Sequence, residues 1–230
     1  MEIKPIAHIS TIFPEKFGVP RQSGLDRSLK GRIVFEKEFR NREALRGLDS
    51  VSHLWLIWEF SMNRSISGEW QPTVRPPRLG GNTRMGIFAT RSPFRPNPLG
   101  LSCVEILSID YEAHDGPVIE VAGADMVDGT PIYDIKPYIK YSDCWPNAVC
   151  NFVDGLAENH LEVVFPPELK RKIDDESLAE SIIEVLKLDP RPSYHNDSNR
   201  EYGISFSNYN IRFRVNENIL EIVDVQLKGQ

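Results

Sequence analysis

The stretch Ser52–Phe60, SHLWLIWEF, carries the strongest strand signal in this sequence of 230 residues. Aromatic and branched side chains dominate it, and neither proline nor glycine interrupts it. Because its apolar residues are nearly continuous, the strand is expected to be buried on both faces or to turn one face towards a closed interior. His53 stands at its start, where a histidine more often fills space than takes part in catalysis.

Further short strand patterns flank this segment, and helical patterns are almost absent before residue 150. Strands are expected at 3–13, 32–38, 86–89, 99–109 and 118–125, and a short helix at 43–48. Pro5 places the first strand at a sheet edge. Residues 86–89 and 99–109 are expected to pair around the loop between them. About seven short strands without crossover helices predict a small antiparallel β-barrel or sandwich, not a doubly wound fold.

The pattern changes after residue 150, and we place a domain boundary there. The second part is expected to contain strands at 161–165, 202–206, 211–215 and 220–225, and helices from Pro166-Pro167 to 173 and at 176–188. The sequence thus predicts a mainly β protein with two domains. Residues 1–150 form the antiparallel barrel, and residues 151–230 form a small α+β domain that serves substrate binding or dimerisation.

Composition excludes several classes of protein. No apolar run approaches the ~20 residues that span a bilayer, and the first eleven residues lack a signal-peptide pattern, so we expect a cytoplasmic protein without a membrane partner. Cys103, Cys144 and Cys150 have no metal-ligand spacing and are expected to be buried thiols. The five histidines are scattered as well, so no metal is expected.

The formal net charge of −6 is unevenly distributed. Residues 1–150 carry 18 Lys and Arg against 18 Asp and Glu, whereas residues 151–230 carry 9 against 15. The acidity therefore belongs to the last third of the chain. The first part remains able to present a basic face to nucleic acid, although the protein is not a general polyanion binder.

The most informative stretch for function is 86–101, GIFATRSPFRPNPLGL. Its three prolines fix φ and push the residues before them towards extended geometry, which lowers the ordering cost of binding. Between Trp70 and Val104 there are five arginines and no Asp or Glu; they are Arg75, Arg78, Arg84, Arg91 and Arg95. Because guanidinium forks suit phosphate and carboxylate, the pattern predicts an anion-binding loop. The alternative is a rigid solvated turn whose arginines pair with carboxylates elsewhere.

Two further polar segments stand out. Asp128-Gly129-Thr130-Pro131 is a tight-turn sequence that can aim a carboxylate and backbone amides at a polar ligand, or simply join two strands. Pro20-Arg21-Gln22 lies in an irregular segment that is either solvated or one wall of a ligand site. The long polar loop at 61–83 exceeds the ordinary loop length of ~12 residues, which favours a functional role.

Taken together, these motifs resemble the TsaA-like family, also called TrmO. The resemblance covers most of residues 1–150, and DPRPSY at 189–194 is similar to the family's bacterial C-terminal extension. It implies a homodimeric enzyme with a single-sheet β-barrel that uses S-adenosylmethionine. It also implies that the methyl group goes to N6 of threonylcarbamoyladenosine, next to the anticodon of threonine tRNA.

The same resemblance implies a set of site residues. The expected cofactor contacts are Pro20, Arg21, Gln22, Ser61, Met62, Arg91, Leu101, Asp128, Gly129, Thr130 and Pro131. Ser61 departs from the histidine common in the family, which favours a backbone contact there. Apart from the resemblance, the positions of the basic groups lead us to expect Arg84, Arg95, Asn97 and Arg191 as the contacts to tRNA.

The group that accepts the substrate's proton stays open at this point. Asp134, Lys136 and Tyr138 are candidates by location, and the threonyl carboxylate of the substrate itself could help. Two other classes of function also remain, namely an RNA-binding module without chemistry and a methyltransferase acting on a small molecule or a protein.

Overall fold

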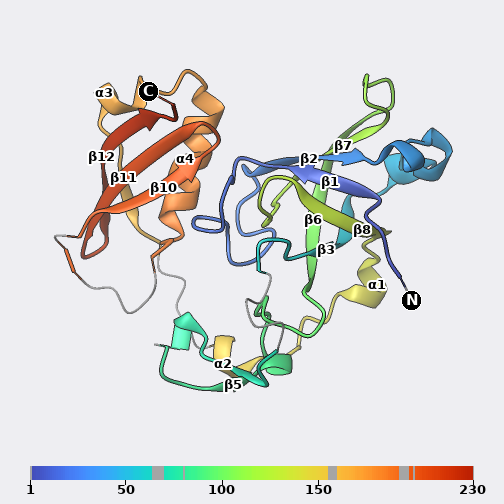
Figure 1. Ribbon diagram of the computed structural model, residues 1–230, viewed down its shortest axis with the longest axis horizontal. Helices are drawn as coiled ribbons and strands as arrows, with labels where there is room; N and C mark the ends of the chain where they lie inside the picture. Colours follow the sequence, from blue (N-terminus) through green and yellow to red (C-terminus); the bar gives the residue numbers. More distant parts are fainter. Residues whose placement is uncertain are drawn as a thin grey trace.

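The structure is a computed structural model that describes residues 2–63, 70–79, 81–154, 160–191, 197–198 and 200–229. Two sheets dominate it, a barrel and a C-terminal sheet, and the N-terminal segment runs between them (Figure 1). The predicted residues 192–194 of the DPRPSY motif lie outside the described residues.

The barrel is a single closed sheet of six strands in the order β1-β2-β7-β6-β3-β8. Every neighbouring pair is antiparallel. The strands are β1 (Ala7–Ser10), β2 (Lys30–Phe35), β3 (His53–Glu59), β6 (Leu99–Asp110), β7 (Val118–Ala122) and β8 (Thr130–Pro137). The predicted mainly β fold with an antiparallel barrel is confirmed, and the sandwich alternative is excluded.

Strand β3 shows why the barrel closes. Its inward residues Leu54, Leu56 and Trp58 are buried, whereas the residues between them are only partly covered. Of the two burial patterns expected for its apolar run, the closed interior is therefore the correct one. The edge position expected for the first strand is wrong, because β1 pairs with both β2 and β8 and Pro5 lies outside it.

Two local expectations before residue 100 are also wrong. Residues 86–89 do not pair with 99–109, because both edges of β6 are occupied by β3 and β7. Instead β5 (Met85–Gly86) pairs with β4 (Thr73–Val74), and Ile87–Ala89 form a 3-10 turn. The helix expected at 43–48 is replaced by two 3-10 turns, Arg42–Leu45 and Leu48–Ser50, which Gly47 separates at a φ of 93°.

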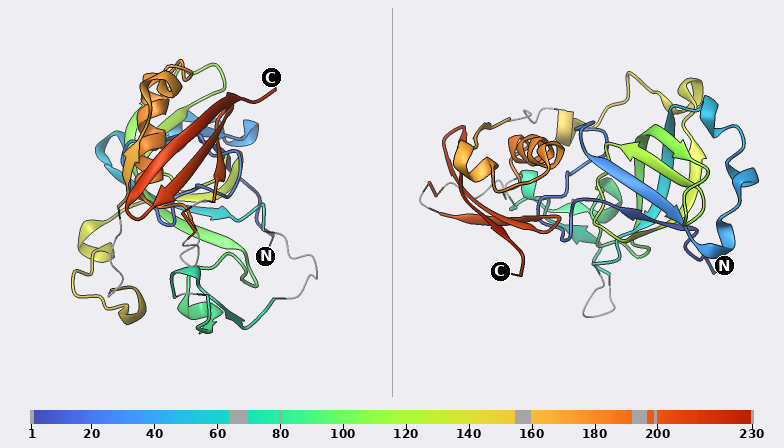
Figure 2. Two further views of the ribbon diagram at one scale, coloured as in Figure 1. Left: turned by 90° about the vertical axis from the view of Figure 1, so that its left-hand side faces the viewer. Right: turned by 90° about the horizontal axis from the view of Figure 1, so that it is seen from above.

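The C-terminal sheet has the order β10-β11-β12-β9, and its last pair is parallel. Its strands are β9 (Glu162–Val164), β10 (Tyr202–Phe206), β11 (Tyr209–Asn216) and β12 (Ile219–Leu227). Helix α4 (Glu176–Lys187) packs Ile182, Val185 and Leu186 into the core of this sheet, while α3 (Pro167–Lys170) contacts β12. Short helices α1 (Lys140–Asp143) and α2 (Asn151–Asp154) lie in the connection from the barrel (Figure 2). The predicted small α+β region is confirmed.

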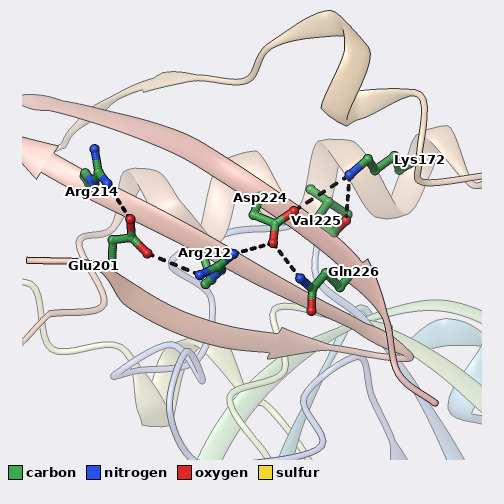
Figure 3. A network of polar contacts seen from close by, with 7 residues as sticks. All are labelled: Lys172, Glu201, Arg212, Arg214, Asp224, Val225 and Gln226. Carbon is green, nitrogen blue, oxygen red and sulfur yellow. Dashed lines mark hydrogen bonds and ion pairs between the residues drawn. The ribbon is translucent and has the colours of Figure 1, made fainter. Parts of the chain in front are cut away.

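Charged residues on the C-terminal strands pair with one another (Figure 3). Glu201 contacts Arg212 and Arg214, and Asp224 accepts from Arg212 Nη2 at 2.7 Å and lies 3.7 Å from Lys172 Nζ. The hydrogen bond from Arg212 holds the pKa of Asp224 below its usual value. These cations are already neutralised by acidic neighbours, so the network is not a free basic surface.

The segment between β1 and β2 belongs partly to the C-terminal core. Phe13 and Leu29 are each 1% exposed and pack in that core, where the rings of Phe13 and Phe206 lie 6.1 Å apart. Gly18, at a φ of 98°, lies against Ile204, because a Cβ there would come within 2.3 Å of the Ile204 side chain. The N-terminal segment thereby ties the barrel to the second sheet.

The three cysteines differ from expectation. Cys103 is partly buried, and burial raises the pKa of its thiol, but Cys144 and Cys150 are exposed. The reason is positional, because both lie in the irregular connection near α1 and α2, which has no core of its own.

Candidate functional site

A cavity of about 700 Å³ lies against one end of β3 and β6. Four segments of the chain line it, and they are far apart in sequence. They contribute Lys16 and Val19–Gln22; Trp55 and Trp58–Asn63; Thr90, Arg91, Pro93, Arg95 and Leu99–Leu101; and Asp125, Val127 and Thr130, with Pro77 at one side. The cavity therefore exists only because the barrel brings these segments together.

The first wall of the cavity is the segment 16–22. Lys16 Nζ donates to Asn63 Oδ1 at 2.7 Å and to the carbonyl of Met62 at 3.3 Å. Arg21 Nη2 donates to the carbonyls of Asp189 and Arg191, each at 3.1 Å. The contacts that hold this wall therefore come from other parts of the chain, namely the loop after β3 and the residues that follow α4.

The second wall is the proline-rich segment 90–101. Its last residues, Leu99–Leu101, pair with β3, and the loop before them is held by contacts of its own. Arg95 Nη1 donates to the carbonyl of Thr90 at 2.7 Å and to that of Ile87 at 3.3 Å. Two three-residue turns tighten it, because Arg95 N donates to Pro93 O at 2.9 Å and Leu99 N to Asn97 O at 2.7 Å. The loop therefore has its shape before any ligand arrives.

Arg91 joins the two walls, since its Nη1 donates to Oε1 of Gln22. It is exposed, and it is one of four basic residues that line the cavity, with Lys16, Arg21 and Arg95. Two carboxylates, Glu59 and Asp125, complete the charged lining. Tyr133 donates its hydroxyl to Glu59 Oε2 at 2.6 Å.

A buried polar chain ends at the cavity. Trp58 Nε1 donates to Ser102 Oγ at 2.9 Å, and Ser102 Oγ donates to Asp125 Oδ1 at 2.6 Å. Burial raises the pKa of Asp125 to about 6, against the Ser102 hydrogen bond and the charge of Arg91, which both lower it. The sequence reasoning missed this chain. Nothing in the neighbouring sequence could have found it, because Ser102 lies 23 residues before Asp125 and Trp58 lies 44 residues before Ser102.

The Asp128-Gly129 turn is largely used by the fold itself. Asp128 Oδ1 accepts from Thr11 N at 2.9 Å, and the backbone amides of Asp128 and Gly129 donate to Phe13 O and Ile9 O. Gly129 has a φ of 73°, as the turn requires. Thr130 and Val127 line the cavity, but Asp128, Gly129 and Pro131 are outside its lining.

The predicted proton acceptors lie apart from the cavity lining. Asp134 and Lys136 form an ion pair at 2.7 Å, and neither lines the cavity. In β8, Asp134 is opposite Ile57 of β3, and Lys136 is opposite Trp55. Tyr138 packs its ring 5.9 Å from that of Trp55, and burial raises the pKa of its phenol. A phenol with a raised pKa is a weak candidate for removing a proton at neutral pH.

The predicted substrate residues are also spread out. Arg95 lines the cavity, whereas Arg84 and Asn97 are exposed outside its lining. Arg191 is bound to Asp189 through Nε at 2.8 Å and Nη2 at 2.9 Å. The side chain of Arg78 lies outside the described residues.

Exposed aromatic rings accompany these basic residues. Trp70, Phe88 and Phe94 are 47%, 73% and 56% exposed, the rings of Trp70 and Phe88 are 6.0 Å apart, and the Arg95 guanidinium lies 5.9 Å from the Phe88 ring. Basic groups and exposed rings together are typical of surfaces that bind single-stranded nucleic acid.

Among the residues that the structure describes, no cluster of three or more His, Cys, Asp or Glu side chains could hold a metal ion. None of the helices within the described ranges is both long and apolar enough to cross a bilayer.

The fold and the cavity define a class of protein, a small closed β-barrel with a mixed apolar and charged ligand site formed by its loops. Residues 8–144 match the tRNA-methyltransferase O N-terminal domain, and residues 158–228 match the TrmO C-terminal domain. The chain belongs to the tRNA-methyltransferase O family.

Similar proteins extend over the whole chain. A tRNA (adenine(37)-N6)-methyltransferase of Escherichia coli (strain K12) is 37% identical over an alignment of 228 residues, and the match covers 96% of this chain and 96% of that protein. A putative S-adenosylmethionine-dependent methyltransferase of Pseudomonas aeruginosa is 33% identical over 97% of this chain and 96% of its own length. A crystal structure of TrmO from the same species superposes with a TM-score of 0.78 and 29% identity, covering 99% of this chain and 97% of that one.

Proposed function

We propose that this protein transfers the methyl group of S-adenosylmethionine to N6 of threonylcarbamoyladenosine, next to the anticodon of threonine tRNA. One observation carries the proposal. Of the eleven residues expected to contact the cofactor, eight line a single cavity, although they come from four separate segments. Membership of the tRNA-methyltransferase O family supports the same reaction.

The residues of the cavity fit the cofactor chemically. Arg91 offers a guanidinium for the α-carboxylate of S-adenosylmethionine, and Trp55 and Leu101 offer apolar surface to its adenine. The cofactor, when bound, supplies an electrophilic methyl group on a sulfonium. The chain contributes position and exclusion of water, because a nucleophilic nitrogen must be desolvated and approach the methyl group in line.

The tRNA would lie over the surface that carries Arg75, Arg84 and the exposed rings of Trp70, Phe88 and Phe94. The rings would stack on unpaired bases of the anticodon loop, and the arginines would contact phosphates. This surface adjoins the cavity, since Arg95 belongs to both.

The proposed substrate can be tested directly. Mass spectrometry of tRNA nucleosides from cells with and without the gene should show N6-methyl-threonylcarbamoyladenosine only in the first. Purified protein with S-adenosylmethionine should restore it on tRNA from the deficient cells. Unchanged nucleosides would contradict the proposal, and methyl incorporation that survives nuclease treatment of an extract would indicate a small molecule or a protein as substrate.

Calorimetry distinguishes an enzyme from a binding module. A pure RNA-binding protein has no use for S-adenosylmethionine, so measurable affinity for it, together with turnover, excludes that alternative.

The tRNA surface can be separated from the cofactor site by substitution. Arg95→Ala is expected to weaken tRNA binding, but its side chain also holds the carbonyls of Thr90 and Ile87, so the loop would loosen too. Arg84→Ala is the cleaner variant because Arg84 is exposed. It should weaken tRNA binding and reduce the salt slope by about one, with cofactor affinity unchanged. Equal loss of both affinities would refute the separation.

We also propose that the protein is a homodimer. The exposed apolar side chains Tyr141, Trp145 and Val149, which are 91%, 76% and 73% exposed, are surfaces that a second copy could cover. Light scattering on the purified chain tests this, and a monomeric mass at micromolar concentration would contradict it.

A further inference from the structure

We propose that the carboxylate of Asp125 is the counter-charge for a cationic group of the cofactor, and that cofactor binding is therefore linked to loss of a proton from this residue. None of the sequence motifs includes Asp125. The inference rests on the proposed use of S-adenosylmethionine and concerns the binding step alone.

Asp125 lies where three of the expected cofactor segments meet. Ser102, its hydrogen-bond donor, follows Leu101 in β6, and Ser23, whose backbone also bonds to it, follows Gln22. Arg91 is close enough for its charge to lower the pKa of Asp125. A ligand that touches these three segments therefore comes close to the Asp125 carboxylate, which itself lines the cavity.

The orientation of this carboxylate is set by hydrogen-bond chemistry. Trp58 Nε1 can only donate, so Ser102 Oγ accepts from it, and the Ser102 hydroxyl donates its own proton to Asp125. Ser102 is 1% exposed, which leaves its proton without access to water. Ser102 therefore favours the ionised form of Asp125 and leaves lone pairs of the carboxylate available to the cavity.

The charges around the cavity show why the cationic group of the cofactor needs a carboxylate as its partner. The groups facing Asp125 are Arg91 across the cavity, with Lys16 and Arg21 on the first wall, Arg95 on the second and Glu59 at the end of β3. Four cations against two carboxylates suit the carboxylate of the cofactor but repel its positive groups. Glu59 already accepts from Tyr133, and Asp125 retains a desolvated carboxylate that a cation would stabilise.

A titration follows from this arrangement. The pKa of Asp125 is about 6 without a ligand, because burial disfavours its charge. A cation bound beside it must lower that pKa, so binding between pH 5 and 6 releases a proton. Affinity should thus rise with pH up to about 6 and be constant above, with a limiting slope of tenfold per pH unit.

The experiment is calorimetry of the full chain with S-adenosylmethionine at pH 5.5 and 7.5, in buffers of different ionisation enthalpy. Wild type should release a proton at pH 5.5 and almost none at pH 7.5. Asp125→Asn should abolish the release and lower affinity at pH 7.5 by about 10- to 100-fold, as expected for a charge-assisted contact. Unchanged affinity and unchanged proton release in Asp125→Asn would overturn the inference.

Two further variants control for indirect effects. Asp110→Asn, at the other end of β6, should bind like wild type. Ser102→Ala keeps the carboxylate but removes a bond that lowers its pKa, so the pH midpoint should move upwards while proton release persists. If Ser102→Ala also abolished the release with its fold intact, the release would not report on the charge of Asp125, and the inference would fail.

A second ligand distinguishes which cationic group is recognised. S-adenosylhomocysteine lacks the sulfonium but keeps the ammonium. Proton release with S-adenosylmethionine alone would identify the sulfonium, and equal release with both would identify the ammonium; either supports the inference. If wild type bound S-adenosylmethionine at neither pH, the proposed function itself would fail, whereas binding without any dependence on Asp125 would overturn only the inference.

Discussion

The two walls of the cavity are held in opposite ways. Segment 16–22 has few contacts within itself and depends on Phe13, Gly18 and Leu29 packing against the C-terminal sheet. In segment 90–101 the loop before β6 is held by its own prolines, turns and the Arg95 side chain, and only its end pairs with β3. A binding site with one wall of each kind can therefore lose its shape in two ways, and different substitutions should cause each of them.

The difference also explains a role for the second domain. The C-terminal sheet contributes no lining residue among those described around the cavity, yet it packs behind the first wall, and the segment after α4 accepts two hydrogen bonds from Arg21. Loss of its core should therefore damage a site that it does not touch.

The largest expected effect is from Phe13→Ala. Phe13 is 1% exposed and packs on Phe206, so truncation should lower the free energy of unfolding by about 3–5 kcal/mol. Cofactor affinity should fall as well, because the first wall loses its anchor. Urea denaturation and calorimetry measure the two effects. Phe88→Ala, at a residue that is 73% exposed, is the matched control and should leave stability unchanged. Full cofactor affinity in folded Phe13→Ala would show that the first wall does not need the second core.

The next effect in size concerns Asp125, which lies between the walls. Its pKa in the folded protein, about 6, is above the ordinary value of 3.8 for an aspartate, so the folded state binds this proton more tightly than the unfolded state. Its contribution to stability therefore decreases as pH rises from about 4 to 6. Asp125→Asn, which cannot ionise, should be more stable than wild type at pH 7.5 by up to about 3 kcal/mol. The advantage should shrink towards pH 4, and urea titrations at both pH values would show it. An advantage that grows on acidification would contradict this sign.

A smaller effect is expected at Gly100, in the part of the second wall that belongs to β6. A Cβ there would lie 2.3 Å from Cε2 of Trp58, and Ser102 holds that indole in place. Gly100→Ala should therefore cost about 1–3 kcal/mol of stability and change the tryptophan fluorescence. Gly203→Ala in β10, where a Cβ meets nothing within 4 Å, is the control. If both variants were equally stable, the indole would have room to move.

The smallest effect is expected on the second wall. Pro96 is exposed, so Pro96→Ala should lower the free energy of unfolding by only about 0.4–1 kcal/mol, through the greater freedom of the unfolded chain. Calorimetry should show weaker cofactor binding with a less favourable entropy, because the loop must then be ordered on binding. A stability loss as large as that of Phe13→Ala would mean that this wall, too, depends on distant contacts.

Much of the fold could be predicted because its signals are local. The apolar run of β3, the amphipathic pattern of α4 and the turn between β11 and β12 each lie within a few consecutive residues. Strand pairing could not be read in the same way. The wrong pairing of 86–89 with 99–109 followed the short distance in sequence, whereas closure of the barrel gave both edges of β6 to other strands.

The residues of the site can be divided in the same way, into those predicted from local sequence and those that depend on distant contacts. Arg91 and the proline-rich loop were predicted from residue types within one stretch. Asp125 was not, because nothing near it in the sequence shows that Ser102 and Trp58 will surround it. The turn at 128–131 shows the same limit, since the sequence does not reveal that the amides of Asp128 and Gly129 donate to Phe13 and Ile9, more than a hundred residues away.

The sequence by itself determined where the long apolar strands lie, how the loop of the second wall is stiffened and where basic groups gather, because prolines, side-chain periodicity and charge act over short distances along the chain. The tertiary structure alone decided which strands are neighbours, which sheet supports the first wall and which carboxylate is desolvated. Those properties depend on burial between residues distant in sequence, and burial exists only once the barrel has closed and the N-terminal segment has packed on the second core.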